Sequence, residues 1–152
     1  MLSVIVDAYA SEQELPVLMA ALTPAAMDGV VRDVVIAAPA TSPMVEAICE
    51  ETGAEVTHGG FGQAAVMARH DRLLVLPASL RLRAGWIGVL NDHLARGGGD
   101  ALVIGQGQGG LRDLWRTPPY GLLMERARLS GLAHAQLKAL RRRLRAPVTR
   151  LG

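Results

Sequence analysis

Arg72-Leu73-Leu74-Val75-Leu76-Pro77-Ala78-Ser79-Leu80-Arg81-Leu82 is the stretch of the sequence that decides the fold. Its unbroken apolar run begins at Leu73 and ends at Pro77, with a charged residue on one side and a turn-prone Pro-Ala-Ser on the other. A short run with such edges is typical of a strand that is buried on both faces, as in a parallel α/β sheet. Ligands of such sheets bind beyond the carboxyl ends of the strands. Pro77, Ala78 and Ser79 therefore stand where functional side chains are expected, and they offer little chemistry.

Segments of the same kind alternate with helical patterns along the chain. Strands that alternate with helices imply right-handed crossovers and a parallel sheet with helices on both faces. The expected fold is therefore α/β, a three-layer α/β/α sandwich with a mainly parallel sheet. The sequence predicts strands over 2–7, 33–38, 54–58, 73–77 and 101–104, and helices over 11–22, 44–52, 63–68, 86–94, 120–132 and 134–145, with a last extended piece over 146–149.

Length and composition indicate a single soluble domain over residues 1–152. Half of the residues are hydrophobic and 20% are charged, so a sizeable core can form. Only 3% are aromatic, too few to build base-stacking platforms for nucleic acid. No window reaches the roughly 18 apolar residues of a membrane span, and no leader precedes the first strand, so a cytoplasmic location is expected. Cys49 is the only cysteine, which excludes an internal disulfide and a cysteine-based metal cage.

Charge is distributed unevenly along the chain. Residues 1–114 hold 7 Arg and 13 Asp or Glu, a balance of −6, whereas residues 115–152 hold 8 Arg, 1 Lys and 1 Glu, a balance of +8. A basic helical segment over about 120–146 suggests an anionic partner, such as a lipid surface at the inner face of the membrane or a lipid-linked acceptor. The alternative is a core-packing helix whose arginines are solvated. Nucleic acid is the weakest interpretation, because arginines without a known module carry little information.

Several motifs resemble family 2 glycosyltransferases. Ser3-Val4-Ile5-Val6 with Tyr9 and Glu12 resembles the opening strand and loop of that family, and Asp33-Val34-Val35-Ile36-Ala37 stands at its second strand. The resemblance continues through Thr52-Gly53-Ala54-Glu55-Val56, Leu73 to Leu82, and Gly85-Trp86-Ile87, with a further likeness from Pro119 to Ala127 on the acceptor side. It implies a nucleotide-diphospho-sugar transferase (GT-A) fold, a nucleotide-sugar donor and a divalent metal held by acidic residues.

The sequence departs from the family where the acids should be. The acid that contacts the nucleoside falls on Ala38, the metal-binding acid on Ser79 and the acceptor-side base on Leu122. A divalent cation normally takes at least one carboxylate, and neither a serine nor an alkyl side chain replaces it as ligand or base. No cofactor is therefore evident from the sequence, and metal binding at Ser79 is not expected.

The remaining candidates follow from the strand ends and from the resemblance. Asp7, at the end of the first strand, is the candidate catalytic residue; the alternative is a solvated or helix-capping acid. His58 and Arg81 are candidate phosphate contacts, although a lone histidine is more often only hydrogen-bonded and Arg81 can belong to a solvated rim. The resemblance assigns nucleotide binding to Ala8, Tyr9, Glu12, Ala38 and Ser79.

Two functions of different classes follow. The first is a divergent glycosyltransferase with weak or no metal-dependent sugar transfer. The second is a catalytically inactive binding or regulatory protein on the same fold, alone or as a homo-oligomer. A nucleotidyltransferase is a third option, weakened by the absence of a glycine-rich loop after the first strand.

Overall fold

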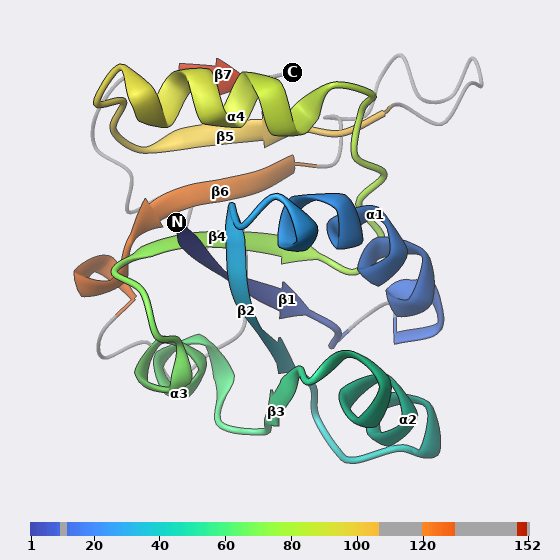
Figure 1. Ribbon diagram of the computed structural model, residues 1–152. Coiled ribbons are helices and arrows are strands. Elements are labelled where there is room, and N and C mark those ends of the chain that lie inside the picture. Colours follow the sequence, from blue (N-terminus) through green and yellow to red (C-terminus); the bar gives the residue numbers. More distant parts are fainter. Residues whose placement is uncertain (10–11, 107–119, 130–148, 152) are drawn as a thin grey trace, which may run out of the picture.

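A computed structural model describes residues 1–9, 12–106, 120–129 and 149–151 of the chain (Figure 1). The first half alternates strictly between strands and helices up to β4, as the sequence predicts. The elements are β1 (Leu2–Asp7), η1 (Glu12–Glu14), α1 (Leu15–Met27), β2 (Val31–Ala37), α2 (Pro43–Thr52), β3 (Glu55–Thr57), α3 (Gly60–Met67), β4 (Arg72–Pro77), α4 (Trp86–Ala95), β5 (Ala101–Ile104), β6 (Tyr120–Glu125), η3 (Arg126–Arg128) and β7 (Thr149–Leu151).

The seven strands form one sheet in the order β3-β2-β1-β4-β6-β5-β7. All neighbouring strands are parallel except those next to β6, which runs antiparallel to both β4 and β5. The predicted mainly parallel sheet is thus confirmed. The carboxyl ends of β1, β2, β3 and β4 share one edge of the sheet, where ligands of such folds bind.

Helices cover both faces of this sheet, which confirms the three-layer architecture (Figure 1). Successive residues of a strand point to opposite faces, so Val4 and Val6 of β1 join the cluster formed with α1, α2 and α4. Ile5 joins the second cluster, which contains Phe61 of α3. Leu73 to Leu76 of β4 are completely buried between the two layers. The doubly buried strand predicted from the sequence is therefore correct.

Helix α2 begins and ends at residues that the sequence marks as boundaries. The Ser42 hydroxyl accepts a hydrogen bond from the Val45 N–H (3.2 Å), which satisfies one of the free donors of the first turn. Gly53 ends the helix with φ of +75°, a conformation that glycine adopts without strain. The start of α2 is thereby fixed directly behind the end of β2.

One prediction is wrong: residues 120–125 form the strand β6 rather than the start of a helix. Leu122 and Leu123 are completely buried and Met124 is 1% exposed, because this run lies between β4 and β5 in the middle of the sheet. A short apolar run does not by itself distinguish a buried strand from a helix. Residues 126–128 form the short η3, and the rest of the predicted basic segment, from residue 130 to about 146, lies outside the described residues.

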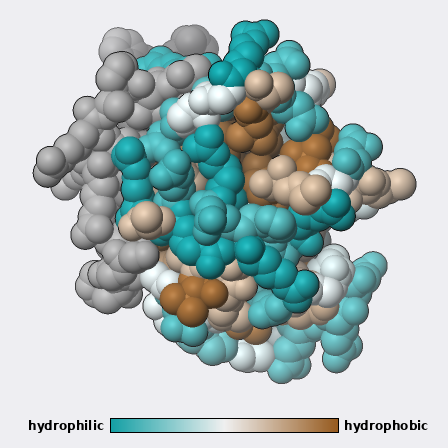
Figure 2. All heavy atoms as spheres, turned by 60° about the vertical axis from the view of Figure 1, so that its left-hand side comes forward, coloured by the Kyte–Doolittle hydropathy of each residue, from teal (hydrophilic) through white to brown (hydrophobic). Residues whose placement is uncertain are grey.

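The surface is mixed in character. Figure 2 shows a face on which apolar side chains form separate patches between hydrophilic ones. Within the described ranges, none of the helices combines the length and the apolar character needed to span a bilayer.

Candidate functional site

The carboxyl ends of four neighbouring strands are tied together by main-chain hydrogen bonds. Ala8 N–H donates to the Ala37 carbonyl (2.9 Å), Ala78 N–H donates to the Asp7 carbonyl (2.9 Å), and Ala38 N–H donates to the Thr57 carbonyl (3.0 Å). These bonds continue the sheet one residue past the strands. The candidate residues that follow β1, β2, β3 and β4 are therefore all placed at one edge of the sheet.

Asp7 is the acid at this edge. Burial raises the pKa of its carboxyl group above the ordinary value, and a hydrogen bond from the Tyr9 N–H (3.1 Å) opposes this effect in part. Among the described residues, the Asp7 carboxylate makes no ion pair. A carboxyl whose pKa is shifted by burial keeps Asp7 as a candidate functional group.

His58 joins the ends of three strands. Its Nδ1 lies 2.9 Å from the carbonyl oxygen of Ala38, and its Nε2 lies 2.9 Å from the hydroxyl of Thr41. Because a carbonyl only accepts, Nδ1 donates the hydrogen of the first bond, and Nε2 shares the second with the Thr41 hydroxyl. The Tyr9 hydroxyl donates to the His58 carbonyl at 3.4 Å. Tyr9 thus links two other candidates, because its N–H is bonded to the Asp7 carboxylate and its hydroxyl to the His58 carbonyl.

The side chains of three further candidates, Glu12, Ala8 and Ala38, are already bonded or buried. The carboxylate of Glu12 accepts a hydrogen bond from the hydroxyl of Ser42, the residue that caps α2. The methyl groups of Ala8 and Ala38 are buried, at 1% and 0% exposed. A ligand could therefore contact only the main-chain atoms of Ala8 and Ala38. At Ala38 the N–H is already bonded to Thr57 and the carbonyl to His58.

The end of β4 holds no acid. Pro77, Ala78 and Ser79 turn the chain, with Leu80 N–H donating to the Pro77 carbonyl (3.0 Å). Within the described part of the chain, no group of three or more His, Cys, Asp or Glu side chains is placed to hold a metal ion. The described side chains around Ser79 therefore do not fit a divalent cation, which requires several hard oxygen ligands.

Leu122 lies in the sheet and not at the ligand edge. It pairs with Val75 of β4 and Leu102 of β5 and is completely buried. The expected place of an acceptor-side base is therefore part of the hydrophobic core. The cause is the same as for the misassigned helix, because Tyr120 to Glu125 form a central strand.

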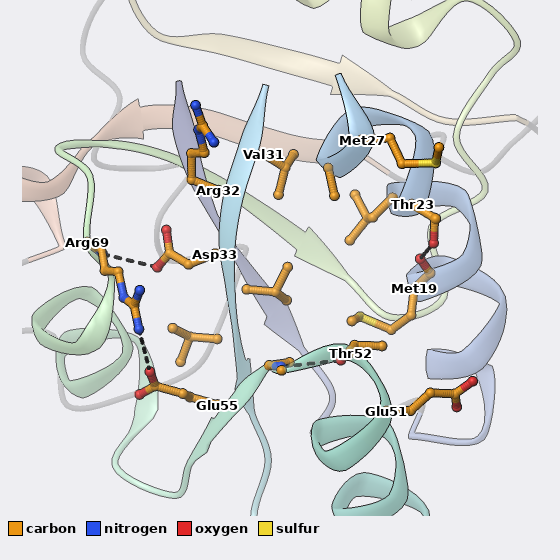
Figure 3. A pocket seen from close by; sticks show the side chains of 16 residues that line it. Met19, Thr23, Met27, Val31, Arg32, Asp33, Glu51, Thr52, Glu55 and Arg69 are labelled. Carbon is orange, nitrogen blue, oxygen red and sulfur yellow. Dashed lines mark hydrogen bonds and ion pairs between the residues drawn. The ribbon is translucent and has the colours of Figure 1, made fainter. Parts of the chain in front are cut away.

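A groove of about 580 Å³ lies at the opposite edge, where β2 and β3 begin (Figure 3). Its hydroxyl groups are bonded within the chain, Thr23 to the Met19 carbonyl and Thr52 to the Ile48 carbonyl. None of the candidate residues lines it. No sequence motif pointed to the groove, because α1, β2 and the turn before β3 form it together. Its lining includes the apolar Met19, Leu22, Met27 and Val31 and the charged Arg32, Asp33, Glu51, Glu55 and Arg69.

Two carboxylates that line this groove, those of Asp33 and Glu55, already interact with other residues of the protein. Asp33 accepts from the hydroxyl of the buried Ser3 (2.5 Å) and from the Arg69 N–H (3.0 Å), which ties the segment before β4 to β1 and β2. The Arg69 guanidinium lies 3.7 Å from the Glu55 carboxylate. This cluster therefore has a structural explanation in holding the strand beginnings together.

The fold is shared with solved structures of low sequence identity. Glucosyl-3-phosphoglycerate synthase from Mycobacterium tuberculosis, in complex with phosphoglyceric acid, matches with a TM-score of 0.60 and 16% identity over 84% of this chain. A protein from Bacillus anthracis assigned as a glucose-1-phosphate thymidylyltransferase gives 0.59 and 12% identity over 99% of this chain and 86% of its own. The bifunctional IspDF from Campylobacter jejuni gives 0.58 and 9% identity over 98% of this chain and 48% of its own.

The chain has a nucleotide-diphospho-sugar transferase (GT-A) fold. This confirms, at the level of the fold, the likeness seen in the sequence. This chain spans 57% of the length of the mycobacterial synthase. That synthase has also been solved with Mn²⁺, UDP-glucose and phosphoglyceric acid. No protein-family model matches the sequence, and no curated protein matches it.

Asp7→Asn is expected to stabilise the protein at neutral pH. Because burial raises the pKa of Asp7 in the folded state, the folded protein binds the proton more tightly than the unfolded chain does. The free energy of unfolding therefore falls as the pH rises through the interval between the two pKa values, and the loss persists above it. Asparagine has no charge to desolvate and keeps an oxygen for the Tyr9 N–H.

Urea denaturation of wild type and Asp7→Asn at several pH values tests this expectation. The advantage of the variant is expected to shrink as the pH falls toward the ordinary aspartate pKa of 3.8. A variant that is less stable than wild type at neutral pH would show that the Asp7 carboxylate has a structural role instead.

Proposed function

We propose that this chain is a divergent glycosyltransferase-like domain that binds a nucleotide or nucleotide-sugar at the carboxyl ends of its strands. The observation that carries the proposal is the joining of Asp7, Tyr9 and His58 at that edge, with Asp7 partly buried and without an ion pair among the described residues. GT-A neighbours with UDP-glucose or UDP bound support this ligand class. Tyr9 and Glu12 are the candidate contacts for the base and ribose. His58, after β3, and Arg81, after β4, are candidate phosphate contacts on opposite sides of β1.

Metal-dependent sugar transfer by this chain is expected to be weak or absent. The neighbouring synthase was solved with Mn²⁺, but Ser79 stands where the resemblance requires the metal-binding acid, and a hydroxyl is a poor substitute for a carboxylate. Asp7 remains the candidate catalytic residue, since it is the acid at the end of β1. A transferred sugar would require such an acid to take a proton from the acceptor hydroxyl.

Thermal unfolding with nucleotides tests the proposal. UDP, GDP, CDP and their sugars are each added with Mn²⁺ and, separately, with EDTA. A ligand that binds only the folded state raises the midpoint by mass action, by about 2.7 kcal/mol of added stability at a hundredfold excess over Kd. At least one nucleotide is expected to raise it without metal. No response to any nucleotide at millimolar concentration would contradict the proposal.

A second candidate function is a non-catalytic binding or regulatory protein on this fold. The absence of acids at Ala38 and Ser79 favours it. The two functions differ in turnover, so the nucleotide-sugar that gives the largest thermal shift is incubated with the protein and its hydrolysis is followed. Hydrolysis that Asp7→Asn abolishes would favour a transferase, and binding without hydrolysis would favour the regulatory function.

A further inference from the structure

Arg81 is held at the ligand edge by its main chain. Its carbonyl accepts a hydrogen bond from the Gln106 N–H (2.7 Å), which joins the segment after β4 to the end of β5. The neighbouring Leu80 is 1% exposed and packs in the core. The bond to Gln106 and the buried Leu80 therefore hold the main chain at Arg81, two residues beyond Ser79, in place.

Among the described residues, the guanidinium of Arg81 has no counter-ion. Its Nη1 atom is buried and has no hydrogen-bond partner, and no ion pair of Arg81 exists among the described residues. Leaving a buried charged donor unsatisfied is costly, more so than for a neutral group. Native structures rarely retain such an atom without a reason, and an absent anionic ligand is one of the recognised reasons.

Among the described residues, the same edge offers no group of side chains that would hold a divalent metal. Ser79 replaces the acid at the end of β4, and Glu12 is already bonded to Ser42. A phosphate bound here would need positive charge from another source. An arginine can supply it, because its planar guanidinium binds phosphate oxygens with two parallel hydrogen bonds.

We propose that Arg81 binds the phosphates of the ligand directly and takes the place of the metal ion. This inference rests on the proposed function and goes beyond it, because it names the phosphate-binding group and makes binding independent of divalent metal. The ligand class is a nucleoside diphosphate or its sugar ester, whose diphosphate provides the acceptor that Nη1 lacks.

Arg83 provides a matched control. It lies two residues further along the same segment and carries the same charge, but its Nε donates to the Gly105 carbonyl (3.0 Å) and its side chain is exposed. Arg81→Gln and Arg83→Gln therefore change the net charge equally, but only Arg81→Gln removes the unpaired Nη1, whereas Arg83→Gln removes a guanidinium that is already bonded to Gly105.

Inorganic pyrophosphate tests the inference without assuming a base or a sugar. Its affinity is measured by calorimetry on the full chain in EDTA, at ionic strength matched with sodium chloride. Wild type and Arg83→Gln are expected to bind alike, and Arg81→Gln to bind at least about tenfold more weakly, since charge-assisted hydrogen bonds are lost. Without ligand, Arg81→Gln is expected to unfold at a higher temperature than wild type, because a buried donor atom without a partner is gone.

Other results would overturn the inference. They are pyrophosphate binding that requires Mn²⁺, an equal loss in both variants, or no binding by wild type. An Arg81→Gln variant that unfolds earlier than wild type would indicate a structural role for the arginine. Binding of UDP, GDP or CDP that survives Arg81→Gln would leave the proposed function intact and refute only the role of Arg81.

Discussion

Leu122→Asp is expected to leave the protein largely unfolded. Leu122 is completely buried between Val75 and Leu102 in the middle of the sheet, and it contributes to the core on the α3 face. An aspartate there is either ionised without a partner or protonated without a hydrogen bond. Both are costly, so we expect a loss above about 4 kcal/mol, a large part of the 5–15 kcal/mol that stabilises a typical domain.

Leu122→Met is the control for this substitution. It keeps the apolar character and nearly the volume, so we expect a loss below about 1.5 kcal/mol. Far-ultraviolet circular dichroism and urea denaturation of the two variants give the comparison. A folded Leu122→Asp protein with an unchanged urea midpoint would show that β6 is not a central strand and that position 122 reaches solvent.

This position also shows how far the sequence resemblance extends. From Leu2 to Leu94 the resemblance, the apolar runs and the structure agree on the order of strands and helices, because each parallel strand is a short apolar run with clear ends. From Tyr120 they diverge. The Leu122 to Met124 run is equally compatible with a helix, and only pairing with β4 and β5, distant in the sequence, decides that it is a strand.

In the candidate site, too, the sequence predicts some features and not others. Asp7 is predictable, because the carboxyl end of a parallel strand is where ligands bind. The bonds of His58 to Ala38 and Thr41 depend on the pairing of β2 with β3, which the sequence does not specify. The unpaired Nη1 of Arg81 is less predictable still, since it depends on every neighbour failing to offer an acceptor.

Gly105→Ala is expected to destabilise the protein and to weaken pyrophosphate binding. A Cβ atom at Gly105 would lie 2.4 Å from Cδ1 of Leu80 and 2.8 Å from the carbonyl oxygen of Arg81. Leu80 is buried and has little room to move, and the Arg81 carbonyl belongs to the main chain and is bonded to Gln106. Such overpacking typically costs about 1–3 kcal/mol.

Gly88→Ala is the matched control, because it adds the same methyl group in α4. No atom lies within 4 Å of a Cβ atom there, and the residue is exposed. Replacing an exposed glycine within a helix should stabilise the protein by about 0.5–1 kcal/mol. The two substitutions are therefore expected to shift the urea midpoint in opposite directions. Equal midpoints would show that the close approach of Gly105 to Leu80 and Arg81 does not occur in solution.

The binding measurement separates the two consequences of the Gly105 substitution. To relieve the clash, the Arg81 main chain must move away from the end of β5, and the side chain that starts there moves with it. The pyrophosphate affinity of Gly105→Ala should then fall at temperatures where the variant is still fully folded, while that of Gly88→Ala stays at the wild-type value. An unchanged affinity in a destabilised Gly105→Ala protein would mean that the link between β5 and the segment after β4 supports the fold without positioning Arg81.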